Sequence, residues 1–263
     1  TLSHSSAASD VYKRQITGVY ETTIAFSFIG PENIPLTTLI GMLFLIIGLL
    51  FKVAAAPFQS WAPDVYQGSP TGYVGFMAST AKAASFVVLA RLCIVSLGLT
   101  MDKFELFFSA IVVSSIFAGS LFATVQTDMK RLIAYSGVVQ SGFILSGMTS
   151  GINGTSASLF YLAAYLIQLT GIFLIFSVIT GELSSDFSMD NLSGLFVENK
   201  FITVCFSIFM LGLAGLPLTS GFVSKFILIT NLWSYEKYIL VFTLMISTAV
   251  SYTHLRAHET TSD

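Results

Sequence analysis

Long apolar segments, each close to the length of a membrane span, alternate along the chain with short polar segments. A transmembrane helix needs about 20 mostly apolar residues. By this measure the sequence predicts helices over 36–56, 72–98, 105–126, 132–149 and 156–180, an interrupted segment over 201–233, and a last helix from Tyr238 onward. The pattern predicts an all-α polytopic membrane protein.

Two of these apolar segments are interrupted by proline and glycine. The first helix is expected to stop before Pro57, and residues 57–70, which include Pro63, are too polar and too broken for a lipid-facing helix. The second interruption covers residues 212–221 and contains Pro217. An ordinary proline kink explains either interruption alone. Paired broken helices are typical of a transport site, because irregular backbone at membrane depth needs protein or a water-filled cavity around it.

Lysines occur within or beside the apolar segments, at Lys52, Lys82 and Lys225. An ionisable group inside a span costs roughly 2.5–3.5 kcal/mol on insertion scales, so it is usually retained for a function. Small residues surround Lys82, which allows other helices to approach closely. Snorkelling to the interface is an equally good explanation for Lys52, which lies near its helix end. We predict that the three lysines form a charge or proton pathway.

The composition agrees with a membrane protein. Of the 263 residues, 54% are hydrophobic and only 10% are charged, with a mean hydropathy of +0.80. A soluble domain usually carries about 25% charged residues. The net charge of −2 argues against a nucleic-acid partner. Cys93 and Cys205 lie in apolar runs without the spacing of a disulfide framework or metal site, so no metal is expected.

The two ends differ in character from the rest of the chain. Residues 1–15 and 250–263 resemble translated sequencing-adapter read-through, and we expect both to be non-native; a real polar tail at each end is the alternative. A signal peptide has a basic segment followed by an apolar one, and residues 1–15 do not show this pattern. The histidines of the chain all lie in these ends: His4, His254 and His258. A histidine ligand or base is therefore not expected within 16–249.

Other polar side chains in or beside the spans are candidates for ordering water in a proton path. They are Gln59, Tyr135, Gln140 and Gln168. The glutamines could instead bond between helices, where such bonds average about 0.6 kcal/mol in one measured system.

Charged and aromatic residues near the segment ends have simpler expected roles. Asp64 is expected to cap a half-helix that begins just after it, either at the interface or at membrane depth. Lys130 and Arg131 precede an apolar segment and are expected to anchor a cytoplasmic helix end. Trp61 and Tyr66 fit an aromatic belt at the interface.

Three motifs together resemble a known family. They are FKVAAAPFQSWAPDVYQGSP from Phe51, DMKRLIAYSG from Asp128 and LAGLPLTSGFVSKF from Leu213. The chain resembles the subunit N family of the bacterial proton-pumping NADH:quinone oxidoreductase, respiratory complex I. The paralogous L and M subunits and related cation/proton antiporter subunits share a Trp-x-Pro-Asp element, but the Pro-Asp-Val-Tyr-Gln-Gly form resembles subunit N. The resemblance covers nearly all of 16–249.

The resemblance implies a fourteen-helix antiporter-like fold with inverted repeats. This chain would supply its C-terminal part, from about the seventh helix into the thirteenth. By matching motifs, Lys52 falls on the lysine of the first broken helix, Lys82 on the central lysine of the next helix, and Lys225 on the lysine of the second broken helix. In the family these lysines lie on a hydrated polar axis, and a glutamate from an earlier helix pairs with the first. The family often has histidine where Gln59 and Gln140 stand, and glutamine has no titratable group to relay a proton.

The implied function is proton translocation through a lysine and water relay, coupled to quinone reduction in partner subunits. The chain would be part of an enzyme without holding a redox centre; NADH, FMN, iron–sulfur clusters and quinone would be bound by its partners. Those partners would be antiporter-like paralogues and small membrane subunits in the bacterial inner membrane, surrounded by lipid. The alternatives are a subunit of a related cation/proton antiporter or membrane-bound redox complex, and a structural subunit whose lysines only pair between helices.

Overall fold

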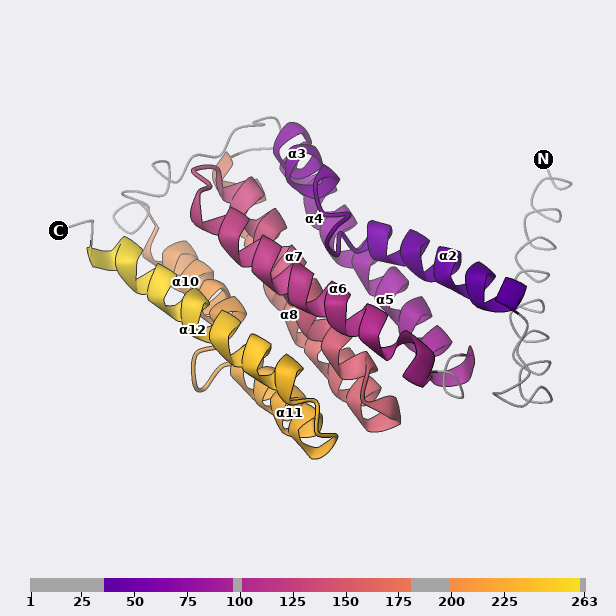
Figure 1. Cartoon of the computed structure of the whole chain (residues 1–263). Helices are drawn as coiled ribbons and strands as arrows, with labels where there is room; N and C mark the ends of the chain where they lie inside the picture. Colours follow the sequence, from indigo (N-terminus) through magenta and orange to yellow (C-terminus); the bar gives the residue numbers. More distant parts are fainter. Residues whose placement is uncertain (1–35, 97–100, 181–198, 261–263) are drawn as a thin grey trace, which may run out of the picture.

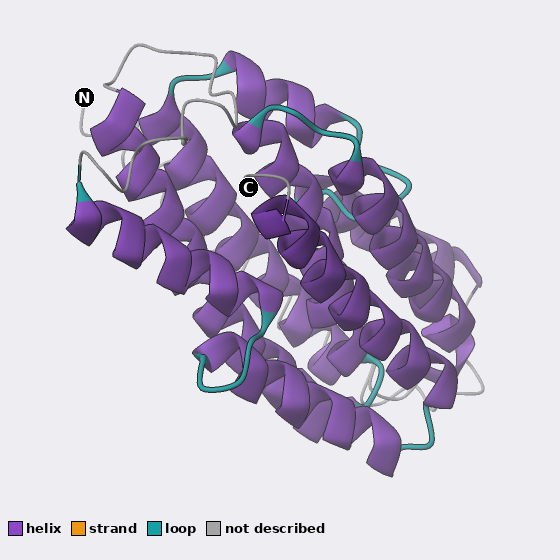
Figure 2. Ribbon diagram, turned by 90° about the vertical axis from the view of Figure 1, so that its left-hand side faces the viewer, coloured by secondary structure: helices purple, strands orange, loops and turns teal. Residues whose placement is uncertain are grey.

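The structure is a computed structural model of the chain that describes residues 36–96, 101–180 and 199–260. Every regular element within these residues is a helix, and the helices form one bundle (Figures 1 and 2). The α-helices are α2 (Leu36–Lys52), α3 (Trp61–Gly68), α4 (Thr71–Phe76), α5 (Lys82–Arg91), α6 (Met101–Thr124), α7 (Met129–Met148), α8 (Gly151–Thr180), α10 (Lys200–Ala214), α11 (Ser220–Ser234) and α12 (Tyr238–Thr260). The all-helical prediction is confirmed.

Within the described residues, three helices are long and apolar enough to cross a membrane, by length and composition. They are the run of α4 and α5 over Thr71–Ile94, α6 over Lys103–Thr124 and α8 over Gly151–Ile179. Shorter apolar helices are found in α2, α10 and α12. Helix α7 is in neither group, although the sequence predicted a span there, because its residues are more polar.

The first break lies between α2 and α3, and its details differ from the prediction. Helix α2 ends at Lys52, four residues before the expected end, because Ala54 has a φ of +57° that a right-handed helix cannot contain. Pro63 does not break a helix, since it lies in the first turn of α3, where proline is tolerated. Asp64 also lies inside α3 rather than before it, so the expectation that it caps a helix is wrong.

The second break lies between α10 and α11, where the sequence placed it. Helix α10 is capped by Gly215, whose φ of +84° is favourable only for glycine, and the Gly215 N–H donates to the carbonyl of Leu211 at 3.0 Å. Helix α11 begins after Thr219, whose side chain accepts a hydrogen bond from the N–H of Phe222 at 3.3 Å. Pro217 lies exposed in the turn between them. Both ends of the break are therefore capped by local sequence.

The run from Thr71 to Ser96 contains two π-helical turns. They are Met77–Ala81, directly before Lys82, and Leu92–Ser96. A π turn inserts an extra residue into the helical repeat and is frequent at functional sites. Here the first one lies directly before the buried Lys82.

Helix α7 is the centre of the bundle. It contacts α3, α6, α8 and α11, and every residue from Gly137 to Met148 is buried (Figure 1). Small residues allow α8 to approach it closely, because a Cβ on Gly154 would overlap the carbonyl oxygen of Gly147. The Ser158 hydroxyl donates to the carbonyl of Ile144 at 2.7 Å. The pair α7 and α8 is therefore a closely packed platform for the polar residues described next.

Candidate functional site

Lys82 is buried against α7 and α8. Its side chain is 3% exposed, and its Nζ donates a hydrogen bond to the carbonyl of Gly137 at 3.3 Å. The Nζ also lies 6.0 Å from the ring centre of Tyr165, within the range of a cation–π contact. Gly137 leaves the space for this contact, because a Cβ there would lie 2.8 Å from Nζ and 3.0 Å from the Tyr165 hydroxyl. The ammonium is held by neutral groups of two helices.

Lys225 is buried at the second break. Its Nζ donates to the carbonyls of Leu213 at 3.2 Å and Ala214 at 2.9 Å, and it lies 5.0 Å from the ring centre of Phe143. These carbonyls end α10 and have no partner within that helix, and the helix dipole favours a cation there. The backbone of Gly215 makes room for the side chain, since a Cβ there would lie 2.9 Å from Cδ of Lys225. The backbone of the second break therefore also holds the ammonium of Lys225.

Gln140 and Tyr161 lie between the two lysines. The Nε2 of Gln140 donates to the carbonyl of Leu213 at 3.2 Å, the same carbonyl that accepts from Lys225. The Tyr161 hydroxyl donates to Oε1 of Gln140, and its ring stacks on Phe143 with centres 5.7 Å apart. Both ends of the Gln140 amide are thus fixed, and α7 is joined to the second break.

Helix α8 presents Tyr161, Tyr165 and Gln168 on one face, because they are separated by four and three residues. Tyr165 lies beside Lys82, Tyr161 bonds to α7, and Nε2 of Gln168 lies 3.2 Å from Oγ of Ser220 at the start of α11. Gly137 and Gln140 of α7 face these three residues. The two helices therefore form a polar seam that runs from Lys82 to the second break.

Ser141 connects the first break to the same seam. Its hydroxyl lies 2.8 Å from the carbonyl oxygen of Gly137 and 3.0 Å from that of Val53, and it can donate to one of them at a time. On α6, Oγ of Ser115 accepts a hydrogen bond from the N–H of Ala56 at 2.9 Å. The irregular backbone of the first break is thus covered by protein, as membrane depth requires.

Three predicted residues are not brought into this network. Lys52 is exposed at the end of α2, and Gln59 has a buried Oε1 with no partner among the described residues. The ring of Tyr135 packs on Phe122, with centres 5.5 Å apart. Pro57, like the proline of the second break, lies exposed in its turn. The structure joins Lys82, Lys225, Gln140 and Gln168 through α7 and α8, and it leaves Lys52, Gln59 and Tyr135 outside this network.

Sequence reasoning missed Tyr161, Tyr165 and Ser141. The signal was present for the two tyrosines, since their four-residue spacing places them on one face of a strongly apolar helix. Nothing in the sequence marks Ser141, because serine often bonds only within its own helix. In the described part of the chain no group of three or more histidine, cysteine, aspartate or glutamate residues could hold a metal ion.

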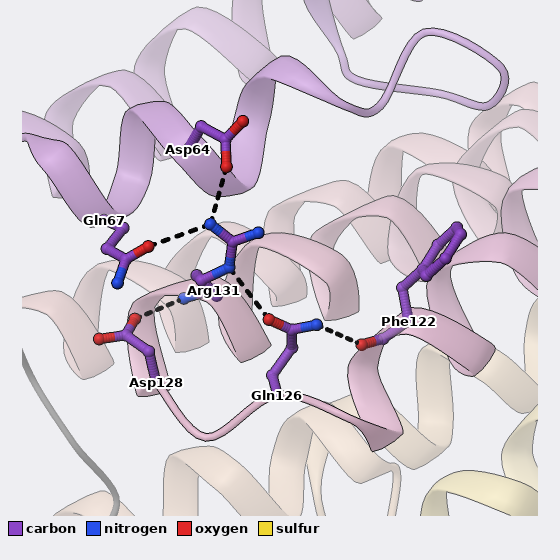
Figure 3. Close-up of polar contacts among 6 residues, drawn as sticks. All are labelled: Asp64, Gln67, Phe122, Gln126, Asp128 and Arg131. Atoms are coloured by element: carbon purple, nitrogen blue, oxygen red, sulfur yellow. Dashed lines mark hydrogen bonds and ion pairs between the residues drawn. The ribbon is translucent and has the colours of Figure 1, made fainter.

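A second polar cluster, the α3–α7 cluster, joins Asp64, Gln67, Gln126, Asp128 and Arg131 (Figure 3). The sequence placed Arg131 as an anchor of a helix end, whereas the structure shows its guanidinium bound to α3. Lys130, which was expected to be a second anchor, is fully buried.

The sequence of this chain is similar to a known family and to known proteins. A family described as NADH:quinone oxidoreductase/Mrp antiporter, transmembrane, matches residues 15–251. The NADH-quinone oxidoreductase subunit N 1 of Symbiobacterium thermophilum is 35% identical over 244 residues, which are 92% of this chain and 50% of that protein. The NADH-quinone oxidoreductase subunit N of Mycobacterium tuberculosis is 44% identical over 193 residues, which are 72% of this chain and 36% of that protein.

Solved structures show the same fold. A chain of respiratory complex I from Thermus thermophilus with bound Aureothin matches with a TM-score of 0.68 and 30% identity, covering 80% of this chain and 46% of that one. A chain of the Mrp complex from a Dietzia species matches with a TM-score of 0.78 and 20% identity, covering 87% of this chain and 43% of that one. The chain spans about half the length of the proteins it matches, or less.

Proposed function

The chain belongs to the NADH:quinone oxidoreductase/Mrp antiporter transmembrane family, and from this premise we propose that it is part of a proton-translocating membrane subunit of NADH:quinone oxidoreductase. The observation that carries the proposal is the pair of buried lysines, Lys82 and Lys225, joined by one polar seam. The relatives with 35% and 44% identity are named as subunit N of that enzyme.

In the proposed mechanism, the lysines carry the protons and the seam connects them. A backbone carbonyl holds an ammonium but cannot take its proton, so the proton leaves through water or a hydroxyl. Tyr161 and Tyr165 offer hydroxyls that both donate and accept. They are one helical turn, about 6 Å, apart, so each step between them needs an intervening water. Gln140 orients this water and its own tyrosine partner without titrating.

Lys52 is proposed to exchange protons with the first break. In the family resemblance its partner is a glutamate from an earlier helix outside this sequence, and its exposure in the described residues leaves a face open for such a partner. Ser141 connects that break to Gly137, the acceptor of Lys82. Gln59, with its buried unpaired Oε1, is proposed to order water beside Lys52. Gln168 is proposed to order water at the second break, where it contacts Ser220. Tyr135, whose ring packs on Phe122, is proposed to order water on the α6 side of α7.

The wider setting is part of the same proposal. The chain acts within a bacterial inner-membrane complex, beside antiporter-like paralogues and small membrane subunits. NADH, FMN, iron–sulfur clusters and quinone are bound by partner subunits, and quinone reduction there drives the proton steps here. Residues 16–249 form the antiporter-like part, and residues 1–15 and 250–263 are proposed to be non-native.

A subunit of a cation/proton antiporter is the second candidate, because the description of the matching family includes Mrp antiporters. The likeness to the Mrp complex chain, at 20% identity, concerns the fold alone. Transport that depends on sodium or potassium and continues without quinone reduction would favour the antiporter.

The test is Lys82→Met in the full-length parent protein within its assembled complex. Quinone reduction and proton uptake are recorded side by side in membrane vesicles. We expect proton uptake to be lost while the complex still assembles, because methionine fills the same space without a transferable proton. Lys103→Met, at an exposed lysine of α6, is the matched control and should pump normally. Normal pumping by Lys82→Met would show that this lysine is structural.

A further inference from the structure

The short helix α3, which follows the first break, is held in place from outside. It has only eight residues, and Ser60 before it provides no side-chain cap. Helices much shorter than about 12 residues are not stable alone. Its orientation must therefore come from the elements that it contacts, and α7 is the main one.

Arg131 of α7 binds two side chains of α3 (Figure 3). Its Nη1 donates to Oδ1 of Asp64 at 2.7 Å and to Oε1 of Gln67 at 3.0 Å, two residues on one face of α3. Its Nε donates to Oε1 of Gln126 at 3.0 Å. The backbone N–H of Arg131 donates to Oδ1 of Asp128, the N-cap of α7, at 3.0 Å. The planar guanidinium is thus held at the start of α7, and it binds the side chains of two α3 residues at the same time.

The first residue of α3 is tied to the end of α2 across the break. Nε1 of Trp61, the first residue of α3, donates to the carbonyl of Phe51 at 3.0 Å. The rings of these two residues stack, with centres 5.8 Å apart and an interplanar angle of 24°. Phe51 directly precedes Lys52. A movement of α3 therefore moves the backbone that carries Lys52.

Helix α7 touches the first break region at two separate places. Arg131 holds α3, and Ser141 lies within hydrogen-bond distance of Val53. Ten residues of helix separate them, a distance of about 15 Å. Gly137, which binds Lys82, lies between these two points. The two attachments together fix the register of the break along α7.

We propose that Arg131 is a positioning residue for proton transfer. By holding α3 on α7 it keeps the first break, with Lys52, aligned with the Gly137 carbonyl that binds Lys82. This inference rests on the proposed function, since it concerns the alignment of the same relay. Arg131 lies at the end of the bundle, outside the seam, and touches neither lysine.

The contribution is to alignment more than to folding stability. The side chains of Arg131 and Asp64 are 27% and 72% exposed, and ion pairs with that much exposure contribute little free energy of folding. The buried Lys130 holds the far end of α3 independently, because its Nζ donates to the carbonyl of Ser69 at 3.2 Å. Loss of the guanidinium should therefore loosen α3 without detaching it.

The experiment uses the full-length protein in its assembled complex, in membrane vesicles, with Arg131→Gln as the main variant. We expect normal amounts of complex and normal quinone reduction with an uncoupler present. Protons pumped per quinone reduced should fall by about fivefold, within the range of roughly two- to thirtyfold for residues that modulate coupling between sites. Arg131→Lys keeps the charge but cannot bind three side-chain oxygens in one plane, so we expect it to pump at an intermediate ratio.

Asp64→Asn provides the second arm. Combined with Arg131→Gln, it should lower the pumping ratio no further than Arg131→Gln alone, because both changes act on the same ion pair between Arg131 and Asp64. Independent, multiplying losses would mean that the two residues act separately, and would overturn the proposal. Arg91→Gln is the matched control, on an exposed arginine of α5, and should pump normally.

Lys82→Met in the same vesicles separates this inference from the proposed function. A defective Lys82→Met beside a normal Arg131→Gln overturns the positioning role alone. Normal pumping by both overturns the relay itself and the inference with it. If neither Arg131→Gln nor Asp64→Asn yields assembled complex, Arg131 is required for folding, and the positioning role is rejected.

Discussion

Gly137→Ala tests whether the Lys82 ammonium must lie at the position that the structure gives it. The added Cβ would lie 2.8 Å from Nζ of Lys82 and 3.0 Å from the hydroxyl of Tyr165, where ordinary contact begins at 3.4 Å. To reach ordinary contact, the ammonium must therefore move away by about 0.6 Å and the hydroxyl by about 0.4 Å. Larger movements are not expected, because both groups lie in a closely packed interior. Both are ends of flexible side chains, so they can move without shifting the backbone.

The substitution should affect function rather than folding. Alanine is favoured over glycine in a helix interior by about 0.8–1.0 kcal/mol, so α7 itself is not weakened. A misplacement of about 1 Å can cost up to about a hundredfold in a rate that depends on alignment. For a shift of little more than half that distance we expect proton uptake to slow by about tenfold.

The assay is initial proton uptake per quinone reduced, in vesicles that contain the assembled full-length protein. Gly48→Ala is the matched control, because it makes the same change in a helix where nothing among the described residues lies within 4 Å of the new Cβ. Normal uptake by Gly137→Ala, together with loss of uptake in Lys82→Met, would refute the reasoning. The lysine would then carry protons from some position other than the Gly137 carbonyl.

Other changes test the rest of the seam. Tyr161→Phe leaves the buried Oε1 of Gln140 without its donor, which should destabilise the purified protein by about 1–3 kcal/mol in denaturant unfolding and slow proton uptake; unchanged values for both would mean that the hydrogen bond is dispensable. Lys225→Met removes the ammonium that binds the end of α10, and proton uptake should be lost while uncoupled quinone reduction continues. Gly221→Ala would place a Cβ on top of the carbonyl oxygen of Gly212, so we expect loss of assembled protein on native gels; normal assembly would show that the second break can open.

The features that the sequence predicted are those with a large local free-energy cost. A charged side chain in an apolar segment and a proline in a helix are both expensive, so Lys82, Lys225 and Pro217 stand out from the sequence alone. The ends of the second break also carry their own capping residues, which explains why its position was predicted closely. At the first break the predicted helix was four residues too long, since no residue type announces the positive φ of Ala54.

The features that it did not predict depend on which helices meet. Arg131 and Asp64 are 67 residues apart, and each alone has the appearance of an ordinary interfacial charge. Gln140 was a candidate, but its partner Tyr161 was not, because a tyrosine in an apolar helix fits the core equally well. Lys52 was predicted from a clear sequence motif, but it lies exposed and is not part of the network among the described residues.

Lys82 and Lys225 share a mode of binding that bears on how protons could be gated. Lys225 is held by the last carbonyls of α10 at the second break, and Lys82 by a carbonyl of α7, directly after a π-helical turn. A carbonyl keeps a fixed charge, so its attraction for the ammonium changes only when its distance or direction changes. Small movements of broken or irregular helices would therefore alter how firmly each lysine keeps its proton. In the proposed relay, this would place a break beside each buried lysine of the seam, and α7, which contacts both sites, would be the element that coordinates them.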